Sequence, residues 1–252
     1  MDLKRKEEFV RLWGKYFGGA ELPIAFYYAD DAGAAERVKS AGGHRCIFAD
    51  LMKVRGGRSL CFDAQSIGCF GGRRYTGFAE ELMPNFEYFL SCGIPGKLEG
   101  ERYKKTPELV QAFVQKAAHM KAPRPFIIFK RWDMLEGPDQ PDVVVFFARP
   151  DVLSGLFTLA NYDVDDPNGV FAPFGASCGS IVQYPYLERL SDSPRAVLGL
   201  FDVSARPFIP EDMLSFSVPM NKFERMTDNM EESFLVTQSW AKIQKRIAKP
   251  RE

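Results

Sequence analysis

Hydrophobic positions recur with two periods along this chain, and the periods predict several of its helices and strands. At residues 3–17 and 46–54, apolar side chains return every three or four positions, which predicts amphipathic helices. The apolar, aromatic runs at 22–30, 124–132 and 141–149 predict buried strands. A turn-rich connection separates the last two runs, so we expect them to pair as a hairpin.

Cap and breaker residues extend this picture. Thr106 followed by Pro107 is a typical helix start, and this helix is expected to run to about Met120. Further helices are predicted at 34–43, at 79–93 and, as one long stretch, at 219–248, while 59–78 is predicted to form a strand and a tight glycine loop.

The order of the predicted strands and helices repeats along the chain. Cys46 and Arg74 recur with the same spacing as Cys178 and Arg206, and residues 24–31 resemble residues 144–151. This echo predicts an internal duplication of a strand-helix-helix-strand unit. Composition alone also makes short apolar strands resemble one another, so both explanations stay open.

The predicted fold class is therefore α+β, with mixed or antiparallel sheets and packed helices. Residues 1–105 would form a first α/β subdomain with a Cys/Gly/Arg loop. Residues 106–252 would form a second, related subdomain that ends in a long helix. We expect a cleft where the Cys46 and Cys178 segments meet.

Composition narrows the classes of partner. The chain has 33 basic and 33 acidic residues, so no net charge draws it to nucleic acid or to a membrane surface. It contains no apolar run long enough for a membrane span and no signal-peptide pattern at its start. Five cysteines make a poor disulfide framework. We therefore expect a cytoplasmic protein with a small-molecule or protein partner, and its oligomeric state is left open.

Standard catalytic motifs are missing. The sequence has no Walker A loop, no dinucleotide-binding G-x-G-x-x-G and no G-x-S-x-G. Only His44 and His119 are present, too few for a histidine-based metal site.

Cysteines are the first group of candidate site residues. Cys46 and Cys178 stand where helices begin, and free N–H groups there favour a thiolate. With Cys61 and Cys69 they would supply four sulfur ligands, as an iron–sulfur cluster or zinc requires. No C-x-x-C pair supports this. The alternatives are that Cys46 is an enzyme's nucleophilic or redox thiol, or that the cysteines are buried and inert.

The glycine loop is the second candidate. Gly71 and Gly72 would expose backbone N–H groups, and Arg73 and Arg74 would hold a carboxylate or phosphate, with Arg206 added from the echoed segment. These residues predict a site for an anionic small molecule. The alternative is a plain turn with surface ion pairs.

The stretch CFDAQSIGCFGGRRYTGF (61–78), with HRCIFADLMKV before it and SFSVPMNKFERM later, resembles domain-of-unknown-function family 169. The resemblance implies a soluble protein with a cysteine followed by glycine and arginine, here Cys69, Gly71 and Arg73 or Arg74. It implies no catalytic residues. Three functions stay open: binding of an anionic small molecule or a thiolate-ligated metal centre, catalysis through Cys46, and a structural or interaction role.

Overall fold

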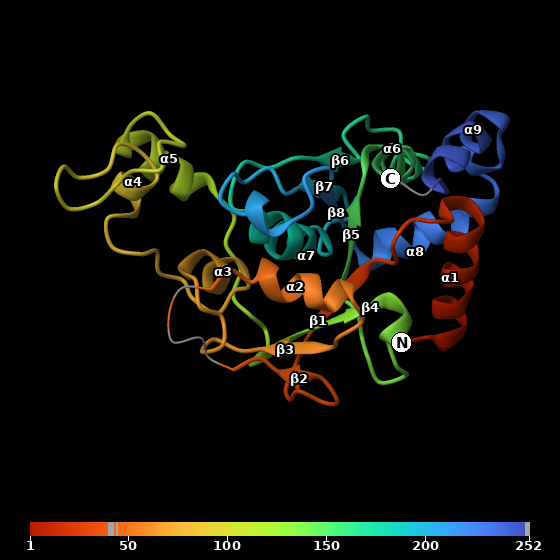
Figure 1. Ribbon diagram of the computed structural model, residues 1–252, viewed down its shortest axis with the longest axis horizontal. Coiled ribbons are helices and arrows are strands. Elements are labelled where there is room, and N and C mark those ends of the chain that lie inside the picture. Colours follow the sequence, from red (N-terminus) through yellow and green to blue (C-terminus); the bar gives the residue numbers. More distant parts are fainter. Residues whose placement is uncertain (40–42, 44, 250–252) are drawn as a thin grey trace.

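A mixed sheet lies at the centre of the chain, and helices pack on both of its faces (Figure 1). The computed structural model describes residues 1–39, 43 and 45–249, and within them the sheet has eight strands in the order β2-β3-β4-β1-β5-β8-β7-β6. The strands are β1 (Ile24–Ala29), β2 (Glu36–Arg37), β3 (Leu60–Phe62), β4 (Phe126–Arg131), β5 (Val143–Ala148), β6 (Val170–Phe171), β7 (Ala196–Gly199) and β8 (Leu214–Pro219).

The helical elements alternate with these strands. The α-helices are α1 (Leu3–Phe17), α2 (Phe48–Arg55), α3 (Phe70–Tyr75), α4 (Phe86–Phe89), α5 (Pro107–Lys116), α6 (Pro150–Ala160), α7 (Tyr184–Glu188), α8 (Met220–Asp228) and α9 (Gln238–Ile247). Shorter turns are η1 (Trp132–Met134), η2 (Gly179–Gln183, a π-helix), η3 (Arg206–Phe208), η4 (Asn229–Glu231) and η5 (Phe234–Val236). The predicted α+β class is confirmed.

The two halves of the sheet have the same topology. β1 and β5 pair antiparallel at the centre. Outward from β1 lie β4, β3 and β2, and outward from β5 lie β8, β7 and β6. In each half the outermost pair is parallel and the others are antiparallel. Cys46 and Cys178 therefore occupy equivalent places, each just before the helix that joins the two outer strands.

The predicted hairpin between the fourth and fifth strands is wrong. β1 lies between β4 and β5 and pairs antiparallel with both, so these two strands run parallel to each other and cannot share a hairpin turn. β4 thereby joins the first half of the sheet, although it lies beyond residue 105.

Several local predictions also needed tertiary information. The segment predicted as a helix at 34–43 contains β2, which pairs with β3 through Glu36 and Arg37. The predicted glycine loop is helix α3, because Cys69 caps it and accepts a hydrogen bond from the Gly72 N–H at 3.1 Å. The stretch predicted as helix at 79–93 keeps only α4, which begins after Pro84. The predicted C-terminal helix is divided into α8, η4, η5 and α9.

One face of the sheet, called here the sealed face, is covered by α1, α6, α8 and α9. Alternate strand residues such as Val144 and Phe146 meet an aromatic layer from these helices and from η1. Trp13 stacks on Phe17 at 4.3 Å between ring centroids, and Trp132 lies 4.7 Å from Phe223. Helix α1 matches its prediction because its buried stripe follows the helical period.

The opposite face, called here the open face, is covered by α2, η2 and α7. The next residues along the strand, Val145 and Phe147, point to this side. The π-helix η2 lies unusually close to β7. A Cβ on Gly199 would stand 1.9 Å from Ser180 Oγ, so only glycine allows this approach. Residues 63–125 connect β3 to β4 and carry α3, α4 and α5, whereas only 200–213 connect β7 to β8. The α4–α5 lobe (residues 79–119) projects to the left in Figure 1.

Candidate functional site

A cavity of about 560 Å³ lies where the open face meets the α4–α5 lobe. Segments from both halves of the sheet form its walls: α2 and α3 from the first half, and 173–180 and 199–208 from the second. Its size is typical of a small-molecule site. Both Cys46 and Cys178 line it, so the two echoed cysteine segments meet at one cavity.

The predicted sulfur ligands are only partly brought together. Cys46, Cys69 and Cys178 line the cavity, whereas Cys61 belongs to the sealed face. Cys92 is exposed in the lobe. Among the described residues, no group of three or more Cys, His, Asp or Glu side chains is arranged to hold a metal ion. The four-cysteine set is therefore not assembled here.

Burial changes the expected chemistry of the thiols. Burial raises the pKa of the Cys46 thiol, although a hydrogen bond from the Phe48 backbone acts in the opposite direction. Cys178 is more deeply buried, and its pKa is raised further by the nearby Cys69 and Cys46. Burial therefore opposes the thiolate that the N–H groups at a helix start would favour.

The structure also brings only some of the predicted anion-binding residues to the cavity. Gly71, Gly72 and Arg74 line the cavity, and Arg73 and Arg206 do not. Arg73 donates from Nε to the Ile67 carbonyl at 2.9 Å.

The arginines that would hold an anion are engaged by backbone carbonyls. The Arg74 guanidinium donates to the Glu80 carbonyl. Arg206 donates to the carbonyls of Met213, Pro210 and Glu211. Of the three arginines, Arg74 is the one that lines the cavity.

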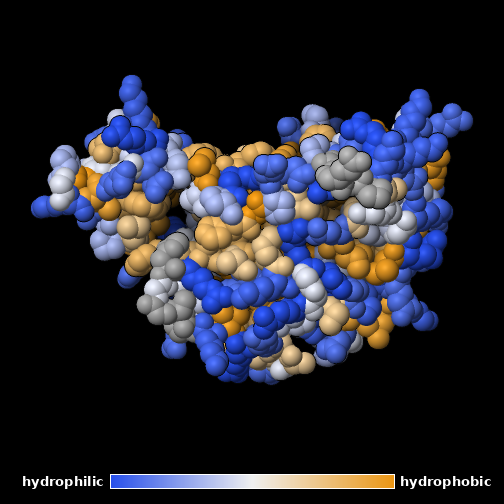
Figure 2. Space-filling view, in the orientation of Figure 1, coloured by the Kyte–Doolittle hydropathy of each residue, from blue (hydrophilic) through white to orange (hydrophobic). Residues whose placement is uncertain are grey.

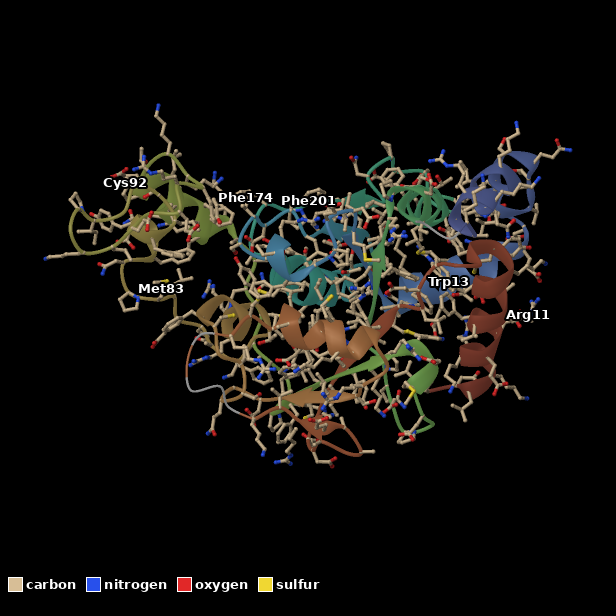
Figure 3. All side chains as sticks on the ribbon, in the orientation of Figure 1. Arg11, Trp13, Met83, Cys92, Phe174 and Phe201 are labelled. Atoms are coloured by element: carbon tan, nitrogen blue, oxygen red, sulfur yellow. The ribbon has the colours of Figure 1, made fainter. Side chains whose placement is uncertain are left out.

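Aromatic side chains supply much of the cavity wall. They come from α2, α3, the lobe and the loops of the second half, and they are Phe48, Phe70, Tyr75, Phe86, Phe89, Tyr103, Phe113, Phe174, Phe201 and Phe208. Four of them are strongly exposed, with Phe70, Phe174 and Phe201 each more than half accessible. Figure 2 shows hydrophobic surface where the lobe on the left meets the body. In Figure 3, Phe174 and Phe201 lie along the upper edge of the body and Met83 lies on the lobe side.

Tyr103, in the lobe, lies close to a side chain of the second half. The Tyr103 hydroxyl, in the lobe, interacts with the side chains of Glu101 and Ser204. Burial, together with the Glu101 hydrogen bond and charge, raises the pKa of Tyr103 to about 12. The raised pKa keeps the Tyr103 hydroxyl available as a donor to the nearby Glu101 carboxylate.

Three carboxylates also line the cavity. Glu81 and Glu101 come from the lobe, and Asp202 follows β7. Asp202 accepts hydrogen bonds from the Ser177 N–H at 3.2 Å, the Ser204 N–H at 3.0 Å and Ser204 Oγ at 2.8 Å.

The sequence interpretation missed the carboxylates and most of the aromatic wall. One signal was available, because Phe70, Phe174, Phe201 and Phe208 stand beside glycine, proline or aspartate, outside the periodic runs. Aromatic residues in such turn-rich segments do not belong to the periodic buried face of a helix or strand. Where they face solvent, they often mark a binding surface.

The described residues include no helix that is both long enough and apolar enough to span a bilayer. No curated protein and no solved structure matches the chain significantly. The profile of domain-of-unknown-function family 169, described as "Uncharacterised ArCR", matches residues 15–229, which include both halves of the sheet and the cavity wall. The chain therefore belongs to this family.

Proposed function

We propose that this protein binds a small molecule in the cavity between the Cys46 and Cys178 segments. The observation that carries the proposal is a cavity of about 560 Å³ whose walls come from both halves of the sheet and from the lobe. Cavities of this size at the junction of structural units are the usual sites for small ligands.

The wall indicates a ligand with a largely apolar body. Ten aromatic side chains and several aliphatic ones line the cavity, with a small number of polar groups among them. Burying apolar ligand surface against such a wall supplies about 25 cal/mol per Å². The few polar groups would fix the ligand's orientation.

The other expected functions receive less support. A thiolate-ligated iron–sulfur cluster or zinc would need Cys61, which faces the other side of the sheet. Catalysis by Cys46 would need an activated thiol, but burial raises its pKa. His44, the nearest base in sequence, lies outside the described residues. An anionic ligand would rely on Arg74 alone among the predicted arginines.

The matching topology supports a further part of this proposal: the two halves of the sheet arose by duplication of one unit of four strands, with a helix between its second and third strands. This unit differs from the strand-helix-helix-strand unit that the sequence predicts. Each half keeps the same strand order and the same pairing directions. The long insertion 63–125 in the first half then supplies the outer wall of the cavity. A cytoplasmic location also belongs to this proposal, and the five free cysteines suit a reducing compartment.

Binding of N-phenyl-1-naphthylamine tests the proposal, because this neutral probe fluoresces when it enters an apolar site. We expect saturable binding by the full chain. Gly71→Trp should abolish it, since Gly71 lines the cavity and a Cβ there meets nothing within 4 Å. Gly14→Trp is the matched control, because Gly14 is an exposed helical glycine in α1 with equally open surroundings.

Absence of saturable probe binding by the parent protein would overturn the proposal. Equal binding by Gly71→Trp and Gly14→Trp would do the same, because the probe would then occupy another surface. Circular dichroism of both variants would verify that each is folded.

A further inference from the structure

We infer that the cavity takes an apolar organic cation, such as a protonated amine carried on an aromatic body. This inference rests on the proposed function and names its class of ligand. It reverses the charge that the arginine-rich segment 69–78 predicts. Three features of the cavity support it: its aromatic faces, its carboxylates and an unpaired hydroxyl.

The aromatic wall already accepts a cation at its edge. The Lys104 ammonium lies 4.0 Å from the ring centroid of Phe174 and 5.2 Å from that of Phe113, and both rings line the cavity. Such contacts arise because the face of an aromatic ring carries negative electrostatic potential. Among the described residues, other lining rings such as Phe86 and Phe201 have no cation over their faces.

The charges on the wall favour a cation as well. Glu81, Glu101 and Asp202 line the cavity, and among the described residues Arg74 is the one cation that lines it. Within the described part of the chain, none of these three carboxylates forms an ion pair. Three carboxylates therefore share this wall with one guanidinium, and the Lys104 ammonium stands at its edge over the Phe174 ring.

Arg74 is poorly placed to reverse this balance. Its guanidinium donates to the Glu80 carbonyl, beside Glu81. An anion in the cavity would have to compete with that carbonyl and approach three carboxylates. A cation meets the carboxylates directly, at the cost of repulsion from one guanidinium.

Ser177 supplies a hydrogen-bonding group that the protein does not use. The residue lines the cavity, is only 2 % exposed, and its hydroxyl has no hydrogen-bond partner among the described residues. A buried polar atom without a partner is costly. A protonated amine carries the N–H donor that this oxygen lacks, but the oxygen itself has almost no accessible surface, so the Ser177 side chain must turn to meet it.

Two ions of nearly equal size and shape but opposite charge test the inference. Tetraphenylphosphonium and tetraphenylborate would each be used to displace N-phenyl-1-naphthylamine from the full chain. We expect the phosphonium to act at about a tenfold lower concentration than the borate, the effect of one desolvated cation–π contact.

Charge variants sharpen the test. Glu81→Gln should reduce the preference for the phosphonium, and Arg74→Met should increase it. Glu7→Gln is the control for net charge, because Glu7 is exposed on α1, which covers the sealed face. It should leave the preference unchanged.

Equal or tighter binding of the borate would overturn the inference, as would identical effects of Glu81→Gln and Glu7→Gln. If the neutral probe still binds in those cases, the proposed function survives and only the ligand class is wrong. If the neutral probe does not bind, both fail together.

Discussion

The two faces of the sheet use the same strands for different purposes. On the sealed face, four helices place large aromatic side chains against the strands, and Phe17, Trp132 and Phe146 are almost fully buried. On the open face, the helices are shorter, and small residues such as Gly199 and Ser180 bring η2 close to β7. One face is filled by its own side chains, and the other leaves a cavity.

The lobe explains why the cavity persists. α2, η2 and α7 do not extend over the whole open face, and the insertion 63–125 covers the remainder from the side. Aromatic residues that would be core on the sealed face are partly exposed here, as Phe174 and Phe201 are. The contrast separates residues that stabilise the fold from residues available to a ligand.

Two aromatic truncations test this contrast most directly. Trp132 is fully buried on the sealed face, and it lies 4.7 Å from Phe223 and 5.3 Å from Phe9 between ring centroids. Trp132→Ala should lower the free energy of unfolding by ~3–5 kcal/mol, because it leaves a large hole in a packed layer. Urea denaturation measures the change.

Phe201→Ala on the open face is the matched truncation. Because Phe201 is 55 % exposed, its loss should change the free energy of unfolding by no more than about 0.5 kcal/mol. It should weaken binding of N-phenyl-1-naphthylamine instead. Similar stability losses for both variants would break the comparison between the faces.

A second prediction concerns a flaw in the packing around α8, which covers the sealed face. Lys222 is 1 % exposed, and its ammonium has no hydrogen-bond partner among the described residues. Burial lowers its pKa, so the unfolded chain binds its proton more tightly than the folded one. Lys222→Met should therefore raise the free energy of unfolding at neutral pH by about 1 kcal/mol.

The pH dependence gives the sign of this effect. Because the pKa of Lys222 is lowered in the folded state, the free energy of unfolding falls as the pH drops towards that folded-state pKa. It rises again as the pH approaches the ordinary pKa of lysine. The advantage of Lys222→Met should shrink accordingly at high pH. Lys242→Met, on the exposed side of α9, is the control and should show no such trend. Destabilisation by Lys222→Met at neutral pH would contradict the prediction.

The smallest expected effect is a difference in labelling rates that leaves stability unchanged. With iodoacetamide at pH 7 and detection by peptide mass spectrometry, Cys92 should react first because it is exposed. Cys46 should react more slowly, since burial raises its pKa, and Cys178 more slowly still. If Cys46 reacted faster than Cys92, catalysis by Cys46 would regain support.

Much of the local structure was predictable from the sequence. The helical period of Phe9, Trp13 and Phe17 predicted α1, and the Thr106–Pro107 pair predicted the start of α5. The apolar runs predicted β1, β4 and β5. Strand partners were not predictable in the same way, because β4 and β5 pair with β1 through backbone groups that every residue carries.

The candidate site shows the same division. The sequence indicated that the Cys46 and Cys178 segments matter, and both line the cavity. It did not indicate that Cys61 faces away, although Cys61 lies in the strand predicted between 59 and 78. Alternation along a strand sends neighbouring side chains to opposite faces, and only the packed helices decide which face is which.

By itself, the sequence determined where α1, α2, α5 and the central strands lie, and it indicated two halves with equivalent cysteines. These features depend on short-range periodicity and on caps, which act within a few residues. The tertiary structure alone decided that Arg73 and Arg206 turn to backbone carbonyls, that burial raises the pKa of Cys46, and that three carboxylates and an aromatic wall share one cavity. Hydration, charge and contact at a site depend on residues that are distant in the chain and near only after folding.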